Sequence, residues 1–304
     1  MRVLVFGAGA VGSVLAAMLS SGSEVDVAVR RDRASRIAKD GITIVGAMER
    51  TVRPGTVPRG RYDVIFIATK AYDVAAAADA VAPYADEGTA IVSLQNGMRH
   101  LDLLSERFGD RAVLAPTTMG AARAGPETVR LAAIGTTVVG SPAGGGERAA
   151  AVAALLNSAG LKSEVSEDIA SEVWMKAVVN ACINPLAALA GVPNGRLLER
   201  KALLSIAEGA CSEAVGASEA CGIVLPYRDA FARVKWVIGS TRDNRCSMLQ
   251  DLEAGRRTEI DEINGELVRK GESAGVPMDI NRSLWTMVRA AEGRGLSSKC
   301  GGST

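Results

Sequence analysis

The chain has 304 residues, of which 48% are hydrophobic and 23% charged. These are ordinary values for a globular protein, and the length suffices for one large domain or two of usual size. Lys and Arg number 35 and Asp and Glu 34, so the formal net charge is +1, which argues against nucleic acid or an anionic membrane surface as a bulk partner.

The cysteines and the single histidine limit the metal sites and catalytic groups that the chain can form. The five cysteines are odd in number, scattered and without a C-x-x-C pair, so they predict neither a disulfide framework nor a thiolate metal site. A reduced, cytoplasmic location fits them best. The single histidine, His100, cannot build a His-rich metal site, and we expect it to be a helix or surface residue. We therefore expect no metal, and any acid–base chemistry must use Lys or a carboxylate.

The start of the chain predicts a β-α-β unit. Residues 3–6 form a short strand-like run, residues 10–20 are apolar enough for a helix packed on a sheet, and residues 24–29 are again strand-like. A signal peptide or membrane span is the alternative for the first 22 residues. The four glycines in this stretch argue against it.

Strands and helices continue to alternate downstream. We expect strands at residues 63–68, 89–93 and 112–115, with helices at 73–82 and 98–108 between them. This spacing is typical of a doubly wound parallel sheet. The sequence pattern changes at residues 117–140, which we expect to be antiparallel strands appended to that sheet. A helix at 147–159 and a strand at 162–165 should follow.

No convincing strand follows residue 167. Helices are expected at residues 168–189, 195–222, 227–238, 258–274 and 282–292. The sequence therefore predicts an α/β fold with two domains. A Rossmann-type nucleotide-binding domain spans residues 1–167, and an all-helical domain spans residues 168–304, with a frayed tail from about residue 295.

The first chemical motif is a glycine-rich turn between the first strand and the first helix. It reads G-A-G-A-V-G and comprises Gly7, Ala8, Gly9, Ala10, Val11 and Gly12. Glycine permits the tight turn and the close approach of a pyrophosphate, while the helix N-terminus supplies amide donors. Because the motif lies in a β-α-β context, it predicts dinucleotide binding.

The second strand indicates which dinucleotide is bound. A carboxylate that takes the ribose hydroxyls of NAD usually stands at its end, but this chain has Arg30, Arg31 and Arg33 there. A guanidinium suits a 2′-phosphate, so we predict NADP, with a solvated basic turn as the alternative. Lys70 and Asn96 follow two later strands, where such a sheet presents its ligands. Each is equally consistent with an ordinary surface or turn residue.

A polar stripe marks the first helix of the second domain. Lys176, Asn180 and Asn184 are spaced by four residues in an otherwise apolar segment, so a helix places them above one another. Buried polar groups must be hydrogen-bonded or face a site. The stripe therefore either connects the core or lines a site.

One more cluster lies at residues 247–265. We expect Thr258 to cap the following helix together with Asp261 three positions on, which places Glu259 in the first helical turn. A helix-dipole carboxylate alone would explain Glu259, and Ser247 could equally be solvent-exposed.

Taken together, these motifs resemble the ketopantoate reductase (2-dehydropantoate 2-reductase) family over nearly the whole chain. The matching segments are G-A-G-A-V-G at 7–12, Lys70, Q-N-G at 95–97, W-x-K-x-x-x-N-x-x-x-N at 174–184, and S-M-x-Q-D followed by T-E-I-D at 247–261. The resemblance implies NADPH-dependent reduction of 2-dehydropantoate to (R)-pantoate, in the route to pantothenate and coenzyme A. Cys246, where a second serine is common, is a minor difference.

The resemblance also implies a role for each matched residue. Lys176 would be the catalytic acid and Glu259 would support it and the substrate. Asn180 and Asn184 would bind the substrate hydroxyl, and Ser247 its carboxylate. The positions of the glycine turn, Arg30, Lys70 and Asn96 would serve the cofactor.

The chemistry of these side chains is consistent with those roles. An ammonium can stabilise the charge that develops on a ketone oxygen and then protonate it. Desolvation should lower the pKa of Lys176 and the carboxylate of Glu259 should raise it again. Asparagines do not change charge near neutral pH and so suit orientation of the substrate.

Two other functions stay open. A related reductase of another 2-oxo or 3-hydroxy acid has the same plan, because one pocket side chain can change the substrate. A non-catalytic NADP-binding sensor is the second, since a fold does not imply an activity. A homodimer is one option for the oligomeric state.

Overall fold

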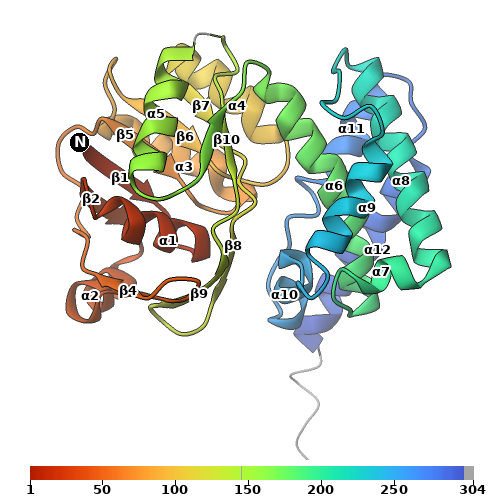
Figure 1. The fold of residues 1–304 in the computed structure, drawn as a ribbon, viewed down its shortest axis with the longest axis horizontal. Coiled ribbons are helices and arrows are strands. Elements are labelled where there is room, and N and C mark those ends of the chain that lie inside the picture. Colours follow the sequence, from red (N-terminus) through yellow and green to blue (C-terminus); the bar gives the residue numbers. More distant parts are fainter. Residues whose placement is uncertain (145, 298–304) are drawn as a thin grey trace, which may run out of the picture. The chain divides into compact units, whose positions relative to one another are not determined.

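A computed structural model describes residues 1–144 and 146–297, and side chains up to residue 292 (Figure 1). The chain divides into two compact units. The first comprises Met1–Gln95 and His100–Ile169; the second comprises Asn96–Arg99 and the residues from Ala170 onward. The split at Ile169 lies two residues beyond the predicted boundary, and the short Asn96–Arg99 segment belongs with the second unit.

A five-stranded parallel sheet forms the centre of the first unit. Its strand order is β2-β1-β5-β6-β7, and all four pairings are parallel. The bounds are β1 (Arg2–Phe6), β2 (Glu24–Ala28), β5 (Val64–Ile67), β6 (Ala90–Ser93) and β7 (Ala112–Leu114). The three inner strands are short, almost wholly apolar runs, as expected where helices cover both faces of a sheet. The predicted doubly wound sheet is thereby confirmed.

Helices α1 and α5 pack on one face of this sheet. Val3 and Val5 of β1 lie in one cluster of buried residues with Leu15 of α1 and Val152 of α5. The helices of the unit are α1 (Ala10–Leu19), α2 (Arg31–Asp40), α3 (Val74–Val81), α4 (Arg99–Phe108) and α5 (Gly146–Ser158). Single turns of 3₁₀ helix flank α3, at Ala71–Asp73 and Ala82–Tyr84, and another follows α4, at Gly109–Arg111.

A second sheet corrects one prediction. Its strands are β4 (Arg50–Val52), β3 (Ile42–Gly46), β9 (Thr128–Ala133) and β8 (Gly120–Arg123), in that order. The expectation that residues 117–140 extend the main sheet is wrong for β8 and β9, because β9 pairs in parallel with β3. Helix α2 and strands β3 and β4 were not predicted. The register of β3 with β9 joins residues more than eighty positions apart, which local sequence patterns do not reveal.

The last strands of the unit form a small parallel pair. Strand β10 (Thr137–Val139) pairs with β11 (Ser163–Val165). Leu114, at the end of β7, exchanges backbone hydrogen bonds of 2.8 and 3.0 Å with Gly140. This part of residues 117–140 thus does reach the edge of the main sheet, as predicted.

The described residues of the second unit form helices joined by turns and loops, with no strand among them (Figure 1). Its helices are α6 (Ile169–Ala190), α7 (Arg196–Glu199), α8 (Lys201–Ala220), α9 (Ala230–Ser240), α10 (Ser247–Glu253), α11 (Asn264–Ser273) and α12 (Asp279–Ser297). The single helix predicted at 195–222 is interrupted at Arg200, whose extended backbone separates α7 from α8. Helix α12 continues past residue 295, where we expected fraying, and residues 298–304 lie outside the described part of the chain.

Buried amides connect four of these helices. The Asn264 side chain of α11 donates to the carbonyl of Ala181 in α6 at 3.2 Å and to Asn281 of α12 at 3.0 Å. Asn281 in turn donates to the carbonyl of Ala210 in α8 at 3.0 Å. Such a network fixes the relative positions of helices whose remaining contacts are apolar.

Helix α6 is the core helix of this unit. It is long and apolar enough to cross a membrane by length and composition alone, but 78% of that stretch is buried inside the protein. Burial among other helices explains why its residues are apolar on nearly every side.

Candidate functional site

The glycine turn lies between β1 and α1, as predicted. A different physical constraint accounts for glycine at each of its three positions. Gly7 has φ +95°, a conformation that side chains disfavour. A Cβ on Gly12 would lie 2.0 Å from the Gly7 carbonyl oxygen, so helix and turn can be this close only with glycine. A Cβ on Gly9 would meet no protein atom closer than 3.9 Å. The protein itself does not require glycine at position 9, which is what a turn shaped for a closely approaching ligand would show.

The arginines after β2 separate into two groups. Arg30 is the residue before α2 and is exposed, as is Arg31. Within the described chain neither side chain has a hydrogen-bond or ion-pair partner. Arg33 instead lies inward, where its guanidinium pairs with Glu127 at 2.8 Å. Only Arg30 and Arg31 are therefore open to a ligand from solvent.

Lys70 stands at the predicted place, three residues beyond β5. The loop that carries it is held by Gln95, whose amide donates to the carbonyls of Ile67 at 2.7 Å and Thr69 at 3.1 Å. Gln95 is buried at the end of β6. Gln95 was not predicted from the sequence, although it follows the same strand as Asn96 and could have been selected by the same argument.

Asn96 belongs to the second unit and contacts Glu259 there. Its amide donates to a Glu259 carboxylate oxygen at 3.0 Å. Gly97, with φ +86°, permits this approach, because a Cβ there would lie 2.2 Å from the carbonyl oxygen of Glu262. The structure thus brings Asn96 together with Glu259, a pairing that the sequence did not reveal.

Glu259 lies in a turn that precedes α11, and the predicted helix cap is wrong. Helix α11 begins only at Asn264. The Thr258 hydroxyl donates to Glu292 of α12 at 2.7 Å instead of capping a helix. Asp261 accepts hydrogen bonds from Trp285 at 2.7 Å and Arg289 at 2.6 Å, both also on α12. Contacts with α12 on both sides of Glu259 therefore hold this turn. The Thr258 hydroxyl oxygen also accepts from the Ile260 amide at 3.2 Å, so it closes a local turn and does not cap a helix.

The polar stripe of α6 is present as predicted. Lys176 and Asn180 are half-buried, and Asn184 is buried. Within the described residues, the amine of Lys176 and the side-chain amides of Asn180 and Asn184 have no hydrogen-bond partner. A stripe that connected the core would be bonded to it, as Asn264 is. The geometry therefore favours the second alternative, that the stripe lines a site.

The charge of Lys176 is tuned by its surroundings. Burial lowers the pKa of its amine from 10.5 to about 8, and the nearby carboxylate of Glu259 opposes that shift. Both effects were expected from the sequence. A lysine with this pKa can donate a proton near neutral pH.

Ser247 and its neighbour complete the cluster. Ser247 is exposed at the first position of α10 and has no hydrogen-bond partner in the described chain. The buried thiol of Cys246 donates to the carbonyl of Asn184 at 3.5 Å and accepts from the Leu249 amide at 3.4 Å. Cys246 thereby joins α10 to the end of the polar stripe, a positioning role that its residue type did not suggest.

Comparison with known proteins identifies the family of the chain. The model "Ketopantoate reductase PanE/ApbA" matches residues 3–144, and "Ketopantoate reductase PanE/ApbA C terminal" matches residues 168–292. The 2-dehydropantoate 2-reductase of Archaeoglobus fulgidus is 35% identical over 294 residues, covering 96% of this chain and 98% of the relative. That of Pyrococcus abyssi is 33% identical over 299 residues, with the same coverage.

Solved structures are similar over nearly the whole chain. A PanE/ApbA family ketopantoate reductase from Ralstonia eutropha JMP134 has a TM-score of 0.89 and 28% identity, covering 97% of this chain and 100% of that one. D-mandelate dehydrogenase with NADH and anilino(oxo)acetate has a TM-score of 0.91 and 26% identity, covering 97% and 99%. The glycine turn and these similarities support a nicotinamide dinucleotide as the cofactor. The chain belongs to the ketopantoate reductase family of oxidoreductases.

Proposed function

We propose that this protein reduces 2-dehydropantoate to (R)-pantoate with NADPH, and that Lys176 supplies the proton. The observation that carries the proposal is the unpaired polar stripe, in which a lysine with a pKa of about 8 lies near Glu259. The full-length relatives named 2-dehydropantoate 2-reductase support the choice of substrate. The reaction would place the protein in the route to pantothenate and coenzyme A, in the cytoplasm.

Lys176 performs two tasks in this proposal. When NADPH is bound, its nicotinamide supplies the hydride that the ketone carbon accepts. Negative charge then develops on the ketone oxygen, and the Lys176 ammonium stabilises that charge and transfers a proton to the oxygen. With a pKa of about 8, about nine-tenths of the amine is protonated at pH 7.

Glu259 keeps Lys176 protonated and oriented. Its carboxylate opposes the loss of the proton that burial would otherwise cause. The Asn96 amide, 3.0 Å away, and the contacts of Thr258 and Asp261 with α12 hold the carboxylate in place. A buried carboxylate fixed in this way provides a constant field at the lysine.

The remaining stripe residues bind substrate. Asn180 and Asn184 offer amide donors and acceptors without charge, which suits the hydroxyl of a small hydroxy acid. The Ser247 hydroxyl, at the first turn of α10, would bind the substrate carboxylate. Because these groups have no partners in the described chain, a bound substrate would not have to displace existing hydrogen bonds.

The cofactor side uses residues of the first unit. The glycine turn would hold the pyrophosphate, Arg30 would take the 2′-phosphate that distinguishes NADP from NAD, and Lys70, which follows β5, would also serve the cofactor. The exposed, unpaired guanidinium of Arg30 supports this role.

The similarity to D-mandelate dehydrogenase favours one alternative, in which the substrate is another 2-oxo acid. A panel assay separates the two functions. Loss of NADPH absorbance is followed with 2-dehydropantoate, benzoylformate and 2-oxoisovalerate, and each reaction is repeated with NADH. We expect kcat/KM to be highest for 2-dehydropantoate with NADPH. A higher value for benzoylformate would refute the proposed substrate, and a higher value with NADH would refute the proposed cofactor.

A further inference from the structure

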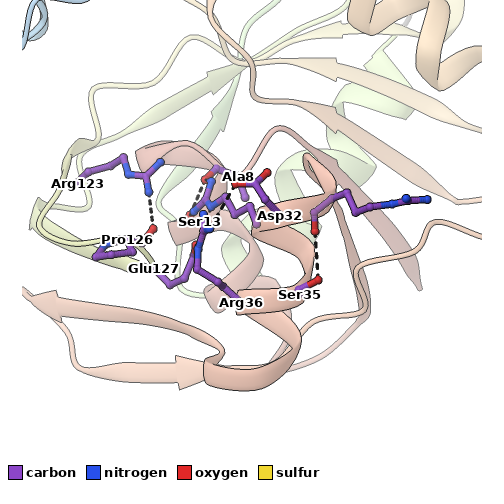
Figure 2. A network of polar contacts seen from close by, with 10 residues as sticks. Ala8, Ser13, Asp32, Ser35, Arg36, Arg123, Pro126 and Glu127 are labelled. Atoms are coloured by element: carbon purple, nitrogen blue, oxygen red, sulfur yellow. Dashed lines mark hydrogen bonds and ion pairs between the residues drawn. The ribbon is translucent and has the colours of Figure 1, made fainter.

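Arg33 is nearly buried although it lies in a cluster of basic residues that otherwise faces solvent. Its side chain is 12% exposed, whereas Arg30 and Arg31 are exposed. Figure 2 shows the polar contacts of this region, where Ala8 of the glycine turn, Ser13 of α1, Arg36 of α2 and Glu127 lie close together. Burying a guanidinium is costly unless it is paired and hydrogen-bonded, so the position needs an explanation.

The guanidinium contacts the glycine turn itself. Nη1 of Arg33 donates to the carbonyl oxygen of Ala8, and the Ser13 hydroxyl donates to the same oxygen at 3.0 Å. In a trans peptide the carbonyl and the following N–H point in opposite directions. Holding the Ala8 carbonyl on the protein side therefore turns the Gly9 N–H away from it. That N–H has no acceptor within the described residues, and a Gly9 Cβ would come no closer to them than 3.9 Å, at the Ala68 carbonyl oxygen.

Glu127 holds Arg33 in place from the second sheet. It lies between β8 and β9 and is 8% exposed. Its two carboxylate oxygens accept from Nε of Arg33 at 2.8 Å and from Nε of Arg36 at 3.1 Å. Its own carbonyl accepts from the Thr43 amide of β3 at 2.9 Å, so the carboxylate is anchored at its backbone.

We propose that Arg33 is a positioning residue that presents the Gly9 N–H to the cofactor pyrophosphate, and that Glu127 acts through Arg33. The three arginines after β2 then have separate tasks. Arg30, with Arg31 beside it, meets the 2′-phosphate, while Arg33 is committed to the turn and does not touch the ligand. The inference rests on the dinucleotide binding of the proposed function, but on neither its substrate nor its preference for NADPH.

Two fragments of the cofactor separate these tasks. ADP carries the pyrophosphate without a 2′-phosphate, and 2′-AMP carries the 2′-phosphate without a pyrophosphate. Their dissociation constants are measured by calorimetry for the wild type, Arg33→Met and the matched control Arg30→Ala. We expect Arg33→Met to weaken ADP about tenfold, as for the loss of one hydrogen bond to a charged group, with 2′-AMP unchanged within about twofold. Arg30→Ala should give the opposite pattern.

Glu127→Gln provides a second test in which Arg33 is retained. It should weaken ADP and spare 2′-AMP, and the double variant with Arg33→Met should lose no more ADP affinity than Arg33→Met alone, because Glu127 acts through Arg33. If Arg33→Met does not fold, Glu127→Gln and Arg33→Lys carry the same comparison. The inference would be overturned if these variants kept the wild-type affinity for ADP, or if their affinity for 2′-AMP fell as much as their affinity for ADP. A wild type that binds neither fragment would instead refute the proposed dinucleotide binding.

Discussion

Replacing Glu259 by Gln should change the pH dependence of the reaction, not only its rate. The Lys176 pKa of about 8 is the balance between burial, which lowers it, and the Glu259 carboxylate, which raises it. Glutamine is nearly the same size, but it lacks the charge. A nearby opposite charge shifts a pKa by about one unit or more, so we expect the pKa of Lys176 in the variant near 7 or below.

The size of the effect follows from the protonated fraction. At pH 8 that fraction falls from about one half to about one tenth, while at pH 6 it falls only from about 99% to about 90%. Because the acid must be protonated, activity is lost as pH rises through the pKa. Glu259→Gln should therefore lose about fivefold more kcat/KM at pH 8 than at pH 6, beyond any pH-independent loss.

The assay is kcat/KM with saturating NADPH between pH 5.5 and 9.5, which reports the pKa of the enzyme before substrate binds. Glu266→Gln, in α11 and paired with Arg269 at 2.7 Å, is the matched control and should keep the wild-type profile. If the alkaline limb of Glu259→Gln coincides with that of the wild type, the electrostatic link between Glu259 and Lys176 is wrong.

Two further predictions concern the cofactor. Arg30→Ala should weaken NADPH at least tenfold more than NADH in fluorescence titrations, because only NADPH carries the phosphate that a guanidinium would bind; equal losses would contradict the NADP assignment. Gly9→Ala should fold with a near-normal melting temperature yet lose cofactor affinity, since its Cβ meets no protein atom closer than 3.9 Å. Gly12→Ala should be destabilised in the same thermal assay, because its Cβ would lie 2.0 Å from the Gly7 carbonyl; equal stability of the two variants would refute this distinction.

Local patterns in the sequence were sufficient for the parallel sheet and the stripe. The glycine turn can be recognised from a strand, a helix and the glycines between them. The stripe can be recognised because Lys176, Asn180 and Asn184 have the spacing of one helix face. The apolar surroundings of Lys176 also predicted the direction of its pKa shift, because desolvation and a neighbouring carboxylate act in known directions.

The contacts that the sequence did not reveal are those between side chains far apart in the chain. Thr258 has the residue type of a helix cap, but Glu292 accepts its hydroxyl hydrogen bond and the helix begins at Asn264. Asn96 was expected at a strand end, but its contact with Glu259, 163 positions further along the chain, could not be read from the sequence. The sequence around Arg33 suggests a solvated arginine, because it does not reveal the ion pair with the distant Glu127. In each case tertiary contact overrides a local preference.

The account depends most on the proton donor, and turnover of Lys176→Ala tests it most directly. Its kcat with NADPH and 2-dehydropantoate is compared with the wild type at pH 7, and NADPH affinity is measured on the same preparation. We predict that kcat falls by about two to four orders of magnitude, the usual contribution of general acid catalysis, while the NADPH dissociation constant stays within about threefold. Near-normal turnover in this variant would contradict the account, because the proton would then come from another group.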